Sequence, residues 1–127
     1  MNKKIINTTK APAPIGPYNQ AILSNNMLYI SGQIALVAET GELLSGDTAV
    51  ETHQVMNNLN EILKEAGITF EHVIKTTIFL SDMSLFAQVN EVYGSYFSGN
   101  YPARETVAAK GLPKNVNVEI SMIATID

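Results

Sequence analysis

The sequence contains no cysteine. It therefore cannot form a disulfide, a thiolate metal site or a thiol nucleophile, and this absence fits a reducing compartment. Charge is also sparse, with 16% charged residues and a net charge of −4 from 8 Lys+Arg against 12 Asp+Glu. Because no basic run is present to attract a phosphate backbone, we expect no nucleic-acid partner.

Long apolar runs are missing as well. No stretch of the sequence approaches the length of a membrane span. The N-terminal segment offers only Ile5 and Ile6, which are too few for the apolar core of a signal peptide. We therefore expect a cytoplasmic protein with no membrane partner.

The usual metal and nucleotide motifs are absent too. His53 and His72 have no second histidine or carboxylate at ligand spacing, so each is expected to be an ordinary solvated histidine. The sequence also has no glycine-rich phosphate loop between a strand and a helix, and no GxSxG motif. These absences predict a protein with no metal and no organic cofactor.

What is present is enough apolar sequence for one core. The chain has 127 residues, of which 46% are hydrophobic. This length supports a single domain, residues 1–127, and is too short for two.

The first half of the sequence predicts a hairpin and a helix. Strands are expected at residues 20–23 and 27–34, joined by a Ser-Asn-Asn turn. A helix is expected to begin with a capping box between Thr48 and Glu51 and to end at Gly67. Its core-facing stripe comprises Val55, Met56, Leu59, Ile62, Leu63 and Ala66.

The second half predicts three strands and another helix. Residues 72–80 are rich in β-branched side chains, and Ser84 is the expected N-cap of the helix that follows. Two final strands are expected near 104–109 and 116–126, paired with each other through the turn at 110–115.

This order of elements predicts an α+β fold in which two helices pack on one face of a mixed sheet. The last strand alternates regularly, with Val118 and Ile120 on one side and Glu119 and Ser121 on the other. The second side is only partly polar. A half-apolar sheet face without a covering helix is typical of a subunit interface, so we expect an oligomer.

Two charged residues in the final strands could carry chemistry. Arg104 could form a salt bridge, or its guanidinium could hold a small carboxylate through paired hydrogen bonds. Glu119 could form an interface ion pair or a hydrogen-bond anchor, or act as a general acid and base with a pKa raised by burial. The remaining polar candidates are Tyr18, Ser31, Asn90 and Thr106.

Four segments resemble those of the RidA family, the reactive intermediate (imine) deaminases. They are APIGPYNQA (13–21), YISGQIAL (29–36), VNEVYGSYF (89–97) and PARETVAAKGLPKNVNVEI (102–120). The resemblance implies a chorismate-mutase-like fold and a homotrimeric barrel with sites between subunits. It also implies hydrolysis of 2-iminobutanoate and 2-iminopropanoate, or their enamines, to 2-keto acids and ammonia. Pyridoxal-phosphate dehydratases release such compounds, and the family requires no cofactor and no metal.

The resemblance also assigns roles to single residues. Arg104 matches the arginine that binds the substrate carboxylate, and Glu119 matches the acid that activates water. Thr106 matches a position whose backbone N–H reaches the ligand, and Gly32 one that allows close backbone approach. The other positions lining the cleft are Tyr18, Ser31 and Asn90.

Two other functions remain open from the sequence. The same arginine could serve a non-enzymatic module that binds small 2-keto carboxylates and signals to a partner. The presence of Glu119 favours the enzyme, because a pure anion site would avoid a nearby carboxylate. An RNA-acting or chaperone-like role is the third possibility, and the net charge of −4 argues against RNA cleavage.

Overall fold

The computed structural model describes residues 2–127 and shows a single sheet with helices on one side. Its elements are β1 (Lys4–Ile6), β2 (Ala21–Ser24), β3 (Met27–Gln33), α1 (Thr48–Glu65), β4 (Val73–Leu80), α2 (Phe86–Gly94), β5 (Ala103–Ala108) and β6 (Val118–Thr125). Short 3-10 turns occupy Phe70–His72, Met83–Leu85 and Pro113–Asn115. The predicted α+β class and the mixed sheet are confirmed.

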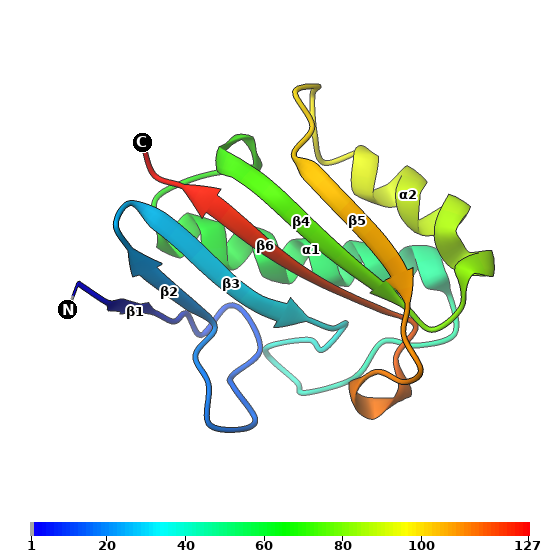
Figure 1. The fold of residues 1–127 in the computed structure, drawn as a ribbon. Coiled ribbons are helices and arrows are strands. Elements are labelled where there is room, and N and C mark those ends of the chain that lie inside the picture. The colour runs from blue at the N-terminus through cyan, green and yellow to red at the C-terminus, as the bar shows by residue number, and fades with distance from the viewer. Residues whose placement is uncertain (1) are drawn as a thin grey trace.

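The sheet has six strands in the order β1-β2-β3-β6-β4-β5. Only β4 and β5 are parallel, and the other neighbouring strands are antiparallel. In Figure 1, α1 crosses behind the sheet and α2 lies along the β5 edge. The edge strand β1 was not foreseen from the sequence, because only two of its residues, Ile5 and Ile6, are apolar.

The predicted pairing of the last two strands is wrong. β6 runs between β3 and β4, so β4 separates it from β5. The Ala109 N–H donates to the Leu80 carbonyl at 2.8 Å, and the Ser81 N–H donates to the Asn117 carbonyl at 2.9 Å. The segment 110–117 thus crosses the end of β4 instead of closing a hairpin.

The core lies between the sheet and the helices. The predicted stripe of α1 is confirmed, since Val55, Met56, Leu59, Ile62 and Leu63 are fully buried. It packs against the inward face of β6, where Val118 and Ile120 are also fully buried. Burial of this kind contributes about 1.5–3 kcal/mol for each large aliphatic side chain.

Both predicted helix caps need correction. Asp47, not Thr48, is the N-cap of α1, and its side chain accepts hydrogen bonds from the N–H groups of Ala49 and Val50. Asp82 takes the role expected of Ser84, because its carboxylate accepts from the Ser84 N–H at the start of the 3-10 turn before α2. In both cases an acidic side chain one or two positions upstream offers the acceptor that the backbone needs.

Glu51, which was expected to cap its own helix, instead supports the sheet. It is 1% exposed, and its carboxylate accepts from the N–H groups of Asn117 and Val118 and from the Asn117 side chain. The start of β6 is therefore fixed from α1.

A buried glutamine holds the N-terminal segment against the sheet. The Gln20 side chain accepts from the Thr8 N–H and donates to the carbonyls of Thr8, Ala11 and Pro12.

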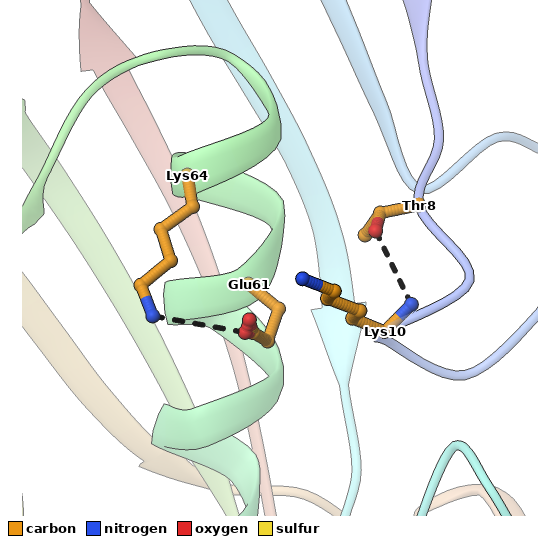
Figure 2. A network of polar contacts seen from close by, with 4 residues as sticks. All are labelled: Thr8, Lys10, Glu61 and Lys64. Carbon is orange, nitrogen blue, oxygen red and sulfur yellow. Dashed lines mark hydrogen bonds and ion pairs between the residues drawn. The ribbon is translucent and has the colours of Figure 1, made fainter.

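Another set of polar contacts lies at the surface. Figure 2 shows the Lys10 N–H donating to the Thr8 hydroxyl, and an ion pair on α1 between Glu61 and Lys64 at 3.9 Å. Exposed pairs of this kind contribute little to stability.

Candidate functional site

The predicted site residues fall into two groups on opposite faces of the sheet. Arg104 is paired with Thr76 in the parallel β4–β5 ladder, and paired residues project to the same face. Thr76 is fully buried on the helix side, so Arg104 also faces that side. Glu119 is paired with Phe79 and alternates with the buried Val118 and Ile120, so it faces away from the helices.

We call Asn90, Arg104 and Thr106 the arginine half of the site. Asn90 and Arg104 line a cavity of about 500 Å³ together with Tyr93, Tyr101 and Pro102. Thr106 lies two positions further along β5 on the same face as Arg104, opposite Ile78. Its hydroxyl oxygen is buried and has no hydrogen-bond partner within the described part of the chain.

Arg104 is held by aromatic rings instead of a carboxylate. Its guanidinium carbon lies 5.1 Å from the ring centre of Tyr93 and 5.7 Å from that of Phe86, both on α2. Within residues 2–127, the ion pairs at 4.0 Å or less join Glu61 to Lys64 and Lys75 to Glu105, and none involves Arg104. Its hydrogen-bonding capacity is thus open to an external anion.

We call Tyr18, Ser31, Gly32 and Glu119 the carboxylate half. They line a cavity of about 380 Å³ with an apolar wall that includes Ile15 and Pro113. Ser31 and Gly32 come from the end of β3, where the register with β6 shifts between Ile30 and Gln33. Gln33 pairs with Ile120 of β6. The irregularity therefore lies beside Glu119, the residue before Ile120.

Gly32 packs directly against the Glu119 side chain. A Cβ atom built on Gly32 would lie 2.9 Å from Cδ and 3.0 Å from Cγ of Glu119 and would clash with the carboxylate. Gly32 and the Glu119 side chain are thus in close contact within one chain. Burial raises the pKa of Glu119 above its usual value, so the protonated form is favoured relative to an exposed glutamate.

Ser31 and Tyr18 are tied to the segment before β2. The Ser31 hydroxyl donates to the Asn19 carbonyl at 2.7 Å, and the Ser31 N–H donates to the Gln20 carbonyl at 2.9 Å. Tyr18 is 46% exposed, and its hydroxyl lies 3.4 Å from the Ile15 N–H. Ser31 thus fixes the backbone next to Tyr18, and its hydroxyl proton is already in use.

The sequence missed the residues that surround Arg104. Neither Tyr93 nor Thr76 was among the predicted site residues. The Tyr93 hydroxyl donates to the Thr76 hydroxyl at 2.9 Å. Burial raises the pKa of Tyr93, against smaller opposing effects of the Thr76 hydrogen bond and the Arg104 charge. The spacing of Asn90 and Tyr93 places both side chains on one face of the helix. This spacing was the signal that could have identified Tyr93 as a residue of the site.

Among residues 2–127, no three His, Asp or Glu side chains come together in a way that could hold a metal ion. The two histidines take local hydrogen bonds instead. Nδ1 of His53 lies 2.8 Å from the Tyr96 hydroxyl, and Nδ1 of His72 accepts from the Thr69 N–H. The helices of the same residue range are all too short or too polar to cross a bilayer.

A family model described as Endoribonuclease L-PSP matches residues 8–126. The chain belongs to the RidA/YjgF/L-PSP family. It is 48% identical over 122 residues to the mouse 2-iminobutanoate/2-iminopropanoate deaminase, covering 96% of this chain and 90% of that protein. The human protein with the same name is 46% identical, with 96% and 89% covered.

Solved structures of this family share the fold. The crystal structure of the YjgF gene product of E. coli matches with a TM-score of 0.93 and 39% identity, covering 98% of this chain and 99% of that one. E. coli TdcF, whose structure was solved with bound serine, matches with a TM-score of 0.93 and 38% identity over 98% and 99% of the chains. The six-stranded sheet with its two helices is thus the RidA fold.

Proposed function

We propose that this protein hydrolyses 2-imino acids such as 2-iminobutanoate and 2-iminopropanoate to 2-keto acids and ammonia. The observation that carries this proposal is an arginine with no carboxylate partner in the described chain, in a molecule whose Glu119 has a raised pKa. A substrate with a carboxylate beside a C=N bond needs a cation that binds the carboxylate and an acid–base group that moves protons during attack on the C=N carbon. The names of the mouse and human relatives support the same reaction.

The two halves of the site would meet across a subunit interface. In one chain the sheet separates Arg104 from Glu119, because β4 lies between their strands and the two side chains project to opposite faces. A closed ring of identical subunits can bring the arginine half of one chain to the carboxylate half of the next. We therefore propose a homotrimer with one site at each interface, as the family resemblance implies.

The residues then have distinct tasks. The Arg104 guanidinium binds the substrate carboxylate, with Asn90 beside it in the same cavity and the Thr106 backbone N–H reaching the ligand. Tyr18, Ser31 and Gly32 line the opposite wall, and Ser31 holds its position through Asn19. A charge-assisted hydrogen bond contributes about 1.5–3 kcal/mol, which is enough to orient a small anion.

Glu119 moves the protons. Its carboxylate accepts a proton from water as the water oxygen bonds to C2, and it returns this proton to the imine nitrogen as the C=N double bond becomes single. Glu119 then accepts the hydroxyl proton of the carbinolamine and passes it to the amino nitrogen while the C–N bond breaks, which leaves a 2-keto acid and ammonia. A raised pKa suits a group that both accepts and returns a proton.

A coupled assay tests the reaction. A threonine dehydratase generates the imine from threonine, and semicarbazide competes to trap it. Added protein is expected to speed the appearance of 2-ketobutyrate and to reduce the semicarbazone. If neither quantity changes with protein concentration, the proposed activity is wrong.

A mixed-oligomer experiment tests the shared site. Arg104→Ala and Glu119→Gln chains with different affinity tags are co-expressed, and species carrying both tags are purified. Each mixed trimer places one intact arginine half against one intact carboxylate half at one of its three interfaces, so the purified mixed species are expected to recover about a third of wild-type activity. Mixing the separately purified variants without subunit exchange is the control. No recovery in the co-expressed sample would contradict a site that spans two chains.

Two alternatives make different predictions. A 2-keto acid-binding module would bind 2-ketobutyrate through Arg104 and leave the imine untouched. An endoribonuclease, the activity in the family model's description, would bind RNA in a salt-dependent way. With 8 Lys+Arg against 12 Asp+Glu, we expect no RNA binding at low salt and no cleavage.

A further inference from the structure

Tyr93 stands out because none of the proposed chemical steps uses it. It is 3% exposed, and its hydroxyl donates to the Thr76 hydroxyl at 2.9 Å in the core. The same ring lies under the Arg104 guanidinium at 5.1 Å. One side chain thus joins the buried face of β4 to the charged group on the edge strand β5.

The strand register makes this connection specific. Thr76 on β4 is the direct partner of Arg104 on β5, and it is fully buried. The hydrogen bond from α2 to Thr76 therefore fixes the Tyr93 ring beside the strand position from which Arg104 projects. Phe86, about two turns earlier in the same helix, places a second ring 5.7 Å from the same guanidinium.

We propose that Tyr93, locked by its hydrogen bond to Thr76, is a positioning residue that holds Arg104 for carboxylate binding. This inference rests on the proposed function, because it assigns to Arg104 the substrate carboxylate. An aromatic face attracts a cation through its quadrupole, whereas a protein carboxylate would pair with the guanidinium donors and compete with the substrate. The ring can thus stabilise the charge and leave the N–H groups free for the ligand.

The test separates the ring from the hydroxyl. Tyr93→Leu removes the ring, whereas Tyr93→Phe keeps it and removes only the bond to Thr76. Binding of 2-ketobutyrate is measured by calorimetry, and the deaminase KM and kcat are measured in the coupled assay. We expect Tyr93→Leu to raise Kd and KM by about 5- to 30-fold, the equivalent of ~1–2 kcal/mol of cation–π attraction. Tyr93→Phe should raise them by only about 2- to 3-fold, and kcat should fall less than KM rises in both variants.

Two further variants keep the test decisive. Tyr96→Leu removes an aromatic ring from the same segment that contacts His53 and Phe70 instead of Arg104, and it should lower stability without changing Kd. Phe86→Leu removes the more distant ring at a position that is 37% exposed, so it should fold normally and raise Kd by a smaller factor than Tyr93→Leu. If Tyr93→Leu does not fold, the Kd of Phe86→Leu measures the effect of the aromatic contact with Arg104 instead.

The outcomes distinguish this inference from the function on which it rests. Unchanged Kd in Tyr93→Leu and Phe86→Leu, or equal losses in Tyr93→Phe and Tyr93→Leu, would overturn the positioning role. If the wild-type protein binds 2-ketobutyrate but hydrolyses no imine, the proposed activity fails while the Kd series still decides the role of Tyr93. If the wild-type protein binds no 2-keto acid, both fail.

Discussion

The arginine half and the carboxylate half of the site are built in different ways. Arg104 projects from an edge strand onto the helix side, where α2 supplies two rings and the core supplies Thr76. Glu119 projects from a central strand onto the side without helices, where it packs on Gly32 beside a loop tied down by Ser31. The proposed anion-binding group is thus supported by the core of its own chain, whereas the proposed proton-transfer group lies on the sheet face without helices, where we propose that another subunit binds.

The largest expected effect comes from removing the arginine. Arg104→Ala should abolish the measurable acceleration of imine hydrolysis and the binding of 2-ketobutyrate, and leave a folded oligomer, because no ion pair within the described chain depends on it. Arg104→Lys is the matched variant, since it keeps the charge and loses the planar fork, so it should retain weak binding. The coupled assay measures the acceleration of imine hydrolysis, and size-exclusion chromatography measures the oligomeric state. Full activity in Arg104→Ala would remove the arginine half from the site.

Removing the carboxylate should separate binding from chemistry. Glu119→Gln should lower kcat/KM by about 10²–10⁴-fold, the range of general acid–base catalysis. Binding of 2-ketobutyrate should stay within a few-fold of wild type, because the substitution leaves unchanged the Arg104 that is proposed to bind the carboxylate from the neighbouring subunit. Calorimetry and the coupled assay on the same preparation provide the measurement. An equal loss of binding and turnover would argue against separate tasks for the two halves.

A smaller change should displace Glu119 without removing it. Gly32→Ala would place a Cβ 2.9 Å from the Glu119 Cδ, so the carboxylate must move. We expect a loss of about 10- to 100-fold in kcat/KM, because a misplacement on the scale of an ångström costs about that much. Gly111→Ala is the control, since a Cβ there meets no atom within 4 Å. Equal activity of the two variants would show that the Gly32 contact is unimportant.

The support beneath the carboxylate half can be tested through stability. Glu51→Gln replaces one acceptor oxygen by a donor next to the buried N–H groups of Asn117 and Val118. We expect the free energy of unfolding to fall by about 1–3 kcal/mol, because an unsatisfied buried polar group costs about that much. Glu61→Gln, which breaks the surface pair of Figure 2, should cost less than about 1 kcal/mol. Denaturant unfolding of both variants gives the comparison, and equal losses would contradict it.

The smallest effect is a pH dependence of stability. Burial raises the pKa of Glu119 in the folded chain, so near neutral pH its charged form disfavours folding. Stability from this group is present at low pH and is lost as pH rises through the folded pKa. Glu119→Gln should therefore be slightly more stable than wild type at neutral pH, and the difference should vanish below the usual glutamate pKa of about 4.5. Thermal melts across this range measure it, and a constant difference would contradict the assignment.

Local patterns predicted the helices, most strands and the faces of single strands. Alternation placed Glu119 on the outward side of its strand, as the structure has it. The caps were less predictable, because Asp47 and Thr48 are both good N-cap residues and only backbone geometry decides between them. The edge strand β1 was missed because its short sequence carries little apolar signal.

The sequence by itself determined the α+β class, the residue types of the candidate site and the alternation that turns Glu119 away from Val118 and Ile120, since side-chain periodicity is a local property. Only the tertiary structure decided that β6 runs between β3 and β4, which puts Arg104 and Glu119 on opposite faces and leaves each half incomplete within one chain. Strand order depends on long-range packing and on how a loop crosses the sheet. The same dependence explains why the contact of Tyr93 with Thr76 and Arg104 became visible only in the folded molecule.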